Sequence, residues 1–376
     1  MEQKKLDLMV ELNGKNPELL NLVIGFDGFV DEIIHVVDKR IDNMNFKRID
    51  TIDAFSSRVK KASGLSTNIE LVPVVKKLGG NGPIMCNALS GTKANITYIG
   101  SLGYPTINEV FRDLEKKVKL YTIENPGHSD ALEFNDGKLI LGKMSSLINV
   151  TYEQLIAVVG EEVLKNLISE ADLFATVNWS MLPKMTDLWQ KLLKNIIANL
   201  PKKNFKPYMF IDLADPEKRE NFEIIEALKL IKEFNVYFKV VLGLNKKEAY
   251  DIANVLELFD EASLKNMQVS LEDLNQSLYE YLQIHGVVIH PVDRSCCVID
   301  NIFYEETGPY AERPKLTTGA GDNFNAGFML GLLLGLRPDL ALLTGMSTSG
   351  FYVRNSRSPE FYELIDFVKL WNENLV

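Results

Sequence analysis

One run of small residues around an acid constrains this chain more than any other part of it, the segment 317–328 with the sequence TTGAGDNFNAGF. Gly319 and Gly321 have no Cβ atom, so the backbone there can turn tightly and approach a ligand closely. The apolar residues that follow, as far as Gly335, predict a buried helix beginning near Asp322. The first N–H groups of a helix have no partner within it and lie at the positive end of its dipole. The segment therefore predicts a site for an anion such as phosphate.

Two interpretations of Asp322 follow from its position. Asp is a common N-cap residue, so Asp322 can simply cap the helix. It can also take the proton of a hydroxyl nucleophile bound beside the phosphate. Capping alone does not explain why Gly-Ala-Gly precedes the acid. Gly-x-Gly turns also occur by chance, so the triplet by itself is a weak signal.

The segment from Thr318 to Phe328 resembles the C-terminal signature of the ribokinase-like (PfkB) carbohydrate kinases in residue type and order. In that family the Gly-Ala-Gly amides form an anion hole, and the Asp is the base that activates the sugar hydroxyl. The resemblance implies that Gly319, Ala320 and Gly321 form the anion hole and that Asp322 is the catalytic base. It also implies an α/β fold, a three-layer α/β/α sandwich with a mostly parallel sheet and a small β-lid. ATP and Mg²⁺ are the implied cofactors, and a monovalent cation such as K⁺ is left open.

Composition limits the class of protein further. A chain of 376 residues can form one large α/β domain or two domains, and the resemblance favours a single kinase domain over 1–376. The net charge of −10 and the lack of a long basic block argue against nucleic acid as the main partner. The longest apolar stretch, Ala326 to Leu336, is too short to span a membrane. Three cysteines and the absence of an apolar signal core predict a cytoplasmic protein without disulfides.

The first apolar run, Leu22 to Phe26, predicts a buried strand followed by Asp27 and Asp31. Ligands collect at the C-terminal ends of parallel strands, so both acids are candidate ligands. Asp is also a common turn residue, and the pattern alone slightly favours that interpretation. The resemblance implies that Asp31 binds substrate hydroxyls and that Asp27 is a second ligand.

A glycine pair provides the other half of the predicted acceptor site. Gly79, Gly80 and Asn81 resemble the family's N-terminal Gly-Gly signature, which holds the sugar, although Gly-rich segments are often plain loops. The Asn-Ala that usually follows soon after the glycines arrives late, at 87–88, so the polar role goes to Asn81. This departure leaves a sugar, a nucleoside or another small alcohol as the acceptor.

Two intervals with alternating apolar and polar residues, about 33–72 and 119–145, predict strands with one exposed face. The first contains a predicted helix at 53–62, and Asp136-Gly137 in the second predicts a hairpin turn. The resemblance implies that both intervals form the lid over the sugar and that a homodimer can form through this lid. From residue 151 onward helices and strands alternate, beginning with a helix over 151–168, which predicts βαβ units.

The second half of the chain contains the candidate metal and nucleotide residues. Asn245 and Glu248 lie three residues apart on one face of a predicted helix and resemble the family's Asn-x-x-Glu motif, which organises Mg²⁺. An N-cap Asn with Glu three residues later gives the same pattern. The resemblance places His290, Asp293 and Ser347 beside the nucleotide, although the family usually has Thr and Gly where this chain has His290-Pro291.

A sugar-binding regulator without catalysis is the alternative from a different class. Leu316 favours it mildly, because the family often has an acid just before the Thr pair. The intact Asp322 and the Asn245/Glu248 pair argue against it. Neither a P-loop motif nor a strand followed by Gly-x-Gly-x-x-Gly occurs in the chain, which excludes two other common nucleotide sites.

Overall fold

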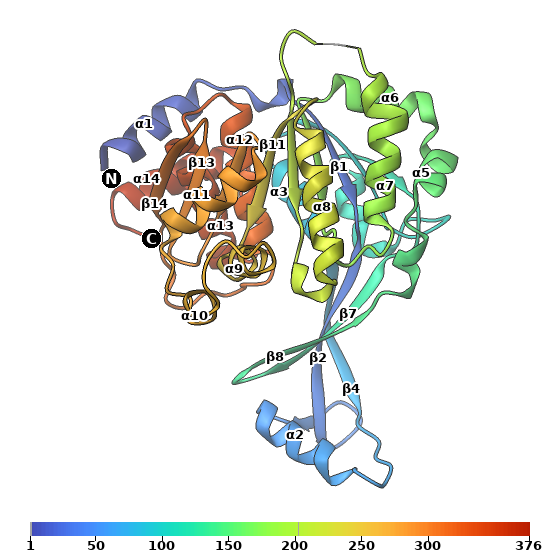
Figure 1. Ribbon diagram of the computed structural model, residues 1–376. Helices are drawn as coiled ribbons and strands as arrows, with labels where there is room; N and C mark the ends of the chain where they lie inside the picture. Colours follow the sequence, from blue (N-terminus) through green and yellow to red (C-terminus); the bar gives the residue numbers. More distant parts are fainter. Residues whose placement is uncertain (1, 202) are drawn as a thin grey trace.

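The computed structural model describes residues 2–201 and 203–376. Figure 1 shows a large body built around one sheet with helices on both faces, from which a second, smaller sheet projects with helix α2 near its tip. None of the helices in the described part of the chain combines the length and the apolar content that crossing a membrane requires.

The main sheet has nine strands in the order β14-β13-β12-β11-β10-β9-β1-β5-β6. The strands from β12 to β6 run parallel to their neighbours, whereas β13 and β14 form an antiparallel edge. Buried parallel strands need apolar residues on both faces, and all five residues of β9 are buried. In chain order the strands are β1 Asn21–Phe26, β5 Asn95–Gly100, β6 Lys119–Thr122, β9 Leu173–Val177, β10 Tyr208–Asp212, β11 Lys239–Leu244, β12 Gly286–Ile289, β13 Arg294–Ile299 and β14 Ile302–Thr307.

Helices cover both faces of this sheet and create a separate hydrophobic core on each side. The core on one face includes α5 Tyr152–Val159, α6 Glu161–Glu170, α7 Met185–Lys191, α8 Asn221–Phe234, α9 Lys246–Val255, α10 Glu261–Lys265 and α11 Leu271–Leu282. The core on the other face includes α1 Glu2–Asn13, α3 Asn81–Ser90, α4 Arg112–Glu115, α12 Ala320–Leu333, α13 Pro338–Asn355 and α14 Phe361–Asn372. The architecture is the three-layer α/β/α sandwich that the sequence predicted.

Helix α12 lies deep in the second of these layers, packed against α13 and α3. Every residue from Asp322 to Leu332 is buried, which explains why the helix is apolar nearly all round and not amphipathic. The burial fixes the position of the helix, and therefore the direction in which its first N–H groups and Asp322 point.

The second sheet consists of β2 Phe29–Arg40, β3 Phe46–Arg48, β4 Leu71–Gly79, β7 Gly127–Phe134 and β8 Gly137–Lys143, with α2 Ile52–Lys61 packed at its far end. Ile34, Val36, Ile49, Leu132 and Phe134 form a small core of its own. The strand β2 follows β1 directly, so the second sheet starts at the edge of the main sheet where its parallel strands end.

Two predicted segments differ from the structure. The lid was expected from 33–72 and 119–145, but β6 pairs with β5 in the main sheet, and the second sheet reaches back to Phe29 and forward to Gly79. Alternation of polar and apolar residues does not distinguish an edge strand of one sheet from a strand of another. The helix expected at 151–168 is divided into α5 and α6 at Gly160, whose φ of +85° interrupts helical geometry.

Candidate active site

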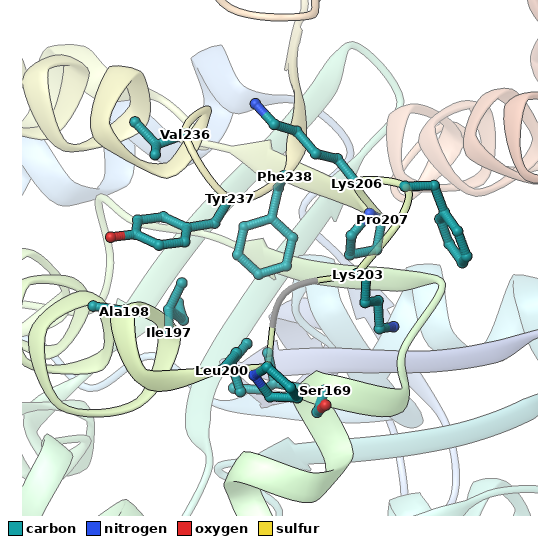
Figure 2. A pocket seen from close by; sticks show the side chains of 13 residues that line it. Ser169, Ile197, Ala198, Leu200, Lys203, Lys206, Pro207, Val236, Tyr237 and Phe238 are labelled. Carbon is teal, nitrogen blue, oxygen red and sulfur yellow. The ribbon is translucent and has the colours of Figure 1, made fainter.

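Polar residues gather where the central parallel strands end. Asp27 follows β1, Asn178 follows β9, Asp212 ends β10 and Asn245 follows β11. At the opposite edge, where β9 to β11 begin, lies a cavity of about 320 Å³. Its walls are largely apolar and include Leu200, Tyr237 and Phe238 (Figure 2). None of the predicted site residues lines that cavity. The candidate active site is therefore at the C-terminal edge of the sheet.

The start of α12 has the geometry of an anion site. Gly319 is the N-cap residue with a φ of +91°, and no side chain caps the helix. Within the described residues, the N–H groups of Gly319, Gly321 and Asp322 have no hydrogen-bond acceptor, whereas Ala320 donates to the carbonyl oxygen of Thr317 at 3.0 Å. The amides of residues 319 to 321 were expected to form the anion hole. The N–H group of Ala320 is instead used within the turn, and the free N–H group of Asp322 takes its place.

Asp322 occupies the first turn of α12 with only 9% of its surface exposed. Burial is the main reason that its pKa is raised well above the ordinary value, and the nearby charges of Asp27, Glu248 and Asp31 act in the same direction. One bond opposes them: Nδ2 of Asn81 donates to Oδ1 of Asp322 at 2.9 Å. Two residues that the sequence predicted for different parts of the site, 241 positions apart, are thus in direct contact.

Asp31 lies on β2, in register with Lys77 on β4. Burial raises the pKa of Asp31, and the charge of Lys77 partly offsets this. A Cβ atom on Gly79 would overlap the carboxyl group of Asp31, so the glycine makes room for the acid. Both residues stand where the second sheet joins the body, and the charge of Asp31 helps to raise the pKa of Asp322.

Asp27 is placed differently from the expectation. It was predicted to be a second substrate ligand, but it is fully buried and its carboxylate accepts hydrogen bonds from the protein on both oxygens. The donors include the N–H groups of Asn81 and Gly82 at the start of α3. Because the prediction considered only the strand and its turn, it missed that α3 begins directly against this carboxylate.

Asn245 and Glu248 form the helix cap that was the alternative to a metal site. Oδ1 of Asn245 accepts from the N–H of Glu248 at 2.9 Å, and Oε2 of Glu248 accepts from the N–H of Asn245 at 2.8 Å. Glu248 is nevertheless 6% exposed, and its Oε1 accepts from the N–H of Asp215 at 3.0 Å. Glu248 therefore takes part in the cap of α9 and is at the same time a buried acid in contact with the loop after β10.

Asp212, which ends β10 and is 6% exposed, was not among the predicted site residues. Burial raises its pKa strongly, and the charges of Glu248 and Asp322 raise it further. Its carboxylate accepts from the N–H of Ala214 and from Nδ2 of Asn325, both at 2.8 Å. An acid at the end of a central parallel strand was the available signal, the same signal that drew attention to Asp27.

A divalent cation suits this arrangement only with its own water shell. No three His, Cys, Asp or Glu residues in the described ranges are grouped to hold a metal ion directly. Asp212 and Glu248 are buried acids, and the charge of Glu248 raises the pKa of Asp212, so a nearby cation would offset an unfavourable concentration of negative charge. Mg²⁺ retains several waters and needs few protein ligands, so these residues fit it.

A cavity of about 360 Å³ leads to the start of α12. Its walls include His290, Pro309, Phe324 and Met346, and it reaches Gly321. The His290 ring lies 4.8 Å from that of Phe324, and burial lowers the pKa of His290 to about 4, so the ring is neutral at pH 7. An apolar slot that ends at free N–H groups suits a nucleotide with its phosphates at the helix.

Two predicted nucleotide residues lie outside this cavity. Asp293 forms an ion pair with Arg294 at 3.1 Å and does not line the cavity. Ser347 is fully buried on α13, whereas Met346, Ser349, Gly350 and Val353 form the face of that helix toward the cavity. Residue 347 lies off the helix face that 346, 349, 350 and 353 share.

Comparison with known proteins agrees with this geometry. The model of the prokaryotic ketohexokinase family matches residues 14–371. The chain belongs to that family. A ketohexokinase of Haloferax volcanii is 26% identical over 349 residues, which cover 92% of this chain and 90% of the relative. Members of the family are carbohydrate kinases, so the chain is a phosphotransferase that uses ATP and an alcohol group as acceptor.

Solved structures confirm the fold of this family member. Ribokinase from Thermotoga maritima has a TM-score of 0.59 at 16% identity, covering 93% of this chain and 99% of that one. Adenosine kinase from Sinorhizobium meliloti has a TM-score of 0.63 at 16% identity, covering 94% and 99%. The ribokinase-like fold predicted from the sequence is therefore correct.

Proposed function

We propose that this chain transfers the γ-phosphoryl group of ATP to a hydroxyl of a ketohexose, with Asp322 as the catalytic base. One observation carries the proposal: Asp322 and free N–H groups meet at the start of α12, in a chain that the prokaryotic ketohexokinase model matches nearly from end to end. The ketohexose comes from the name of this family and of the relative from Haloferax volcanii.

The N–H groups of Gly319, Gly321 and Asp322 would donate to the transferring phosphoryl group. These N–H groups have no acceptor among the residues that the structure describes, and burial holds the helix in place. They therefore need no rearrangement to offset the negative charge of the phosphoryl group. The neutral ring of His290 and the apolar wall of the cavity would hold the base of the nucleotide. Asp293 and Ser347 have no role in nucleotide binding in this proposal.

Asp322 would act on the acceptor hydroxyl. Because Asn81 donates to its Oδ1, its Oδ2 is left to accept the hydroxyl proton. The acceptor oxygen forms its bond to the γ-phosphorus as the bond from that phosphorus to ADP breaks, and the proton passes to Oδ2. Phosphoryl transfer of this kind depends mostly on positioning and charge stabilisation.

The acceptor would lie between Asp322 and the second sheet. Asp31 can accept hydrogen bonds from sugar hydroxyls, and Asn81 borders the same space through its contact with Asp322. Gly79 and Gly80 have no side chain, so they would contribute by letting the chain pass close to Asp31 and Asp27, respectively. The second sheet would then be a lid, which shields the reacting groups from water.

Glu248, Asn245 and Asp212 would hold Mg²⁺ through its waters, beside the phosphates. When bound, the ion would offset the negative charge of the phosphates. The protein's contribution is to keep Asp212 and Glu248 buried and oriented by hydrogen bonds from Ala214 and Asp215. This arrangement predicts that Glu248→Gln weakens Mg²⁺ binding measured by calorimetry in the presence of a non-hydrolysable ATP analogue.

Three finer features are also part of the proposal. A monovalent cation would bind near the anion hole, and we therefore expect faster turnover in K⁺ than in Na⁺ at equal ionic strength. A homodimer through the second sheet has support from the exposed apolar residues Val74 and Val75 on β4 and Ile140 and Leu141 on β8. A cytoplasmic location has support from three buried, free cysteines.

The test of the proposed function is ADP release from ATP and Mg²⁺ with a panel of acceptors. The panel contains ketohexoses, aldohexoses, pentoses and adenosine, with a blank that lacks any acceptor. We expect ketohexose-dependent turnover above every other class. Preference for an aldose or adenosine would refute the ketohexose, and acceptor binding without turnover on the whole panel would support the non-catalytic alternative.

A further inference from the structure

The carboxylate of Asp27 lies beneath the start of α3 and is completely removed from solvent. Its Oδ2 accepts from the N–H of Asn81 at 2.9 Å, and its Oδ1 accepts from the N–H of Gly82 at 2.9 Å. These are the first two residues of the helix. An acid from the turn after β1 therefore replaces the side-chain cap that Gly80, the N-cap residue, cannot supply.

Two further donors hold this carboxylate in place. Nδ2 of Asn178, in the loop after β9, donates to Oδ2 of Asp27 at 2.7 Å. The hydroxyl of Tyr98 on β5 donates to the backbone carbonyl of Asp27 at 2.6 Å and lies 3.3 Å from its Oδ1. The surroundings are also closely packed, because a Cβ atom on Gly80 would lie 2.8 Å from Oδ2 of Asp27.

The residue whose N–H Asp27 binds is also the one that contacts the base. Asn81 receives Asp27 at its backbone and donates from its side chain to Oδ1 of Asp322. The start of α3 is therefore held on one side by a buried anion, while on its other side it sets the direction of the Asp322 carboxylate. Asp27 touches neither the anion site at α12 nor the cavity that leads to it.

We propose that Asp27 is a positioning residue for phosphoryl transfer: by binding the first two N–H groups of α3 it fixes Asn81, and through Asn81 it orients Asp322 toward the acceptor hydroxyl. This inference rests on the proposed function of Asp322. It replaces the expectation that Asp27 is a substrate ligand. The buried acid orients Asp322 through Asn81, separately from the direct effect of its charge on the pKa of Asp322.

The test is a double-mutant cycle with the full chain, MgATP and the best acceptor from the panel. Asp27→Asn keeps the size of the side chain but provides only one acceptor oxygen for the two N–H groups. We expect kcat to fall about tenfold or more, the scale of one hydrogen bond to a charged group, with the KM for ATP unchanged. In an Asn81→Ala background the same substitution should change kcat by less than about twofold, because the link to Asp322 is already broken.

Two milder variants keep the test decisive if Asp27→Asn does not fold. Asn178→Ala and Tyr98→Phe each remove one donor to Asp27 but leave both bonds to α3, and we expect smaller losses of kcat that also vanish in the Asn81→Ala background. Ser295→Ala, which alters a fully buried hydroxyl on β13, is the matched control and should leave kcat unchanged.

The results separate this inference from the proposed function. Wild-type protein without acceptor-dependent turnover would refute the function itself. An active wild type, with variants at Asp27, Asn178 and Tyr98 that retain full kcat, would refute the positioning role. Equal factors of loss in the two backgrounds would also refute it, because they would mean that Asp27 acts independently of Asn81.

Discussion

Helices α3 and α12 begin alike but treat their free N–H groups in opposite ways. Each starts after a glycine with positive φ, +93° at Gly80 and +91° at Gly319, and neither has a side-chain cap from its own N-cap residue. At α3 the carboxylate of Asp27 occupies the first two N–H groups. At α12 the N–H groups of Gly321 and Asp322 have no acceptor among the described residues. A helix start attracts an anion in both cases, and the protein supplies that anion only at α3.

This difference assigns separate tasks to two similar sequences. Gly-Gly-Asn at 79–81 and Gly-Ala-Gly at 319–321 both indicate a backbone that can approach a ligand closely. In the proposed mechanism, the first would fix the residues around the acceptor, and the second would leave room for a phosphoryl group. The contact between Asn81 and Asp322 joins the two helix starts into one site.

Alanine at each N-cap glycine should separate the two tasks, and this is the largest effect that we expect from the comparison. Both substitutions force a Cβ atom into a left-handed conformation, which costs about 1–3 kcal/mol of stability. Gly319→Ala also brings that atom to 2.9 Å from the Tyr352 hydroxyl, so we expect kcat/KM for ATP to fall at least about tenfold. Gly80→Ala should raise the KM for the acceptor and leave the KM for ATP unchanged. Steady-state kinetics with each substrate varied in turn would check this, and identical profiles for the two variants would contradict it.

The pH profile should report the link between the helices. Asp322 can act as a base only when ionised, and its raised pKa means that activity declines as the pH falls through a value above that of an ordinary Asp. Asn81 favours the ionised form. We therefore expect Asn81→Ala to move the acidic limb of kcat/KM to higher pH, by about one unit. Ser295→Ala is the control, and an unmoved limb in Asn81→Ala would show that the bond does not tune the base.

Inorganic sulfate offers the mildest test, because it can fill only the free helix start. We expect weak competitive inhibition against ATP and none against the acceptor, since Asp27 already occupies the start of α3. Gly319→Ala should abolish this inhibition. Inhibition competitive with the acceptor alone would place the anion at the wrong helix.

Local pattern predicted much of this site. The buried helix after Gly321, the strand ending before Asp27 and the helix start at Asn245 depend on residues close together in the chain, and all three are found. The resemblance to a known family added the order of these parts. Both kinds of signal are contained in short stretches of sequence, so the sequence alone is sufficient to predict these parts of the structure.

Long-range contacts account for what the sequence did not predict. Asp27 was expected to face the substrate, but α3, more than fifty positions later, covers it. The carboxylate of Asp212 accepts a hydrogen bond from Asn325, 113 positions away. Ser347 was expected beside the nucleotide, but it is buried away from the cavity, because the rotation of α13 depends on its packing against other elements, chiefly α12. In each case the deciding partner lies on an element that no local pattern connects to the residue.

The central claim is that Asp322 is kept buried and charged for catalysis at a cost to stability. A carboxyl group whose folded pKa is raised contributes stability at low pH, and that contribution is lost as the pH rises through the folded pKa. At pH 8, Asp322→Asn should therefore raise the melting temperature, by about 2 °C or more, and this gain should disappear near pH 4.

The measurement that tests this most directly is kcat and melting temperature of wild type and Asp322→Asn, on the same samples at pH 8. The account predicts changes of opposite sign: kcat falls by about a thousandfold or more, the upper range for general base catalysis, while the melting temperature rises. A variant that keeps its activity would remove Asp322 from the mechanism. A variant that loses both activity and stability would show that Asp322 mainly supports the start of α12, the interpretation as a simple helix cap.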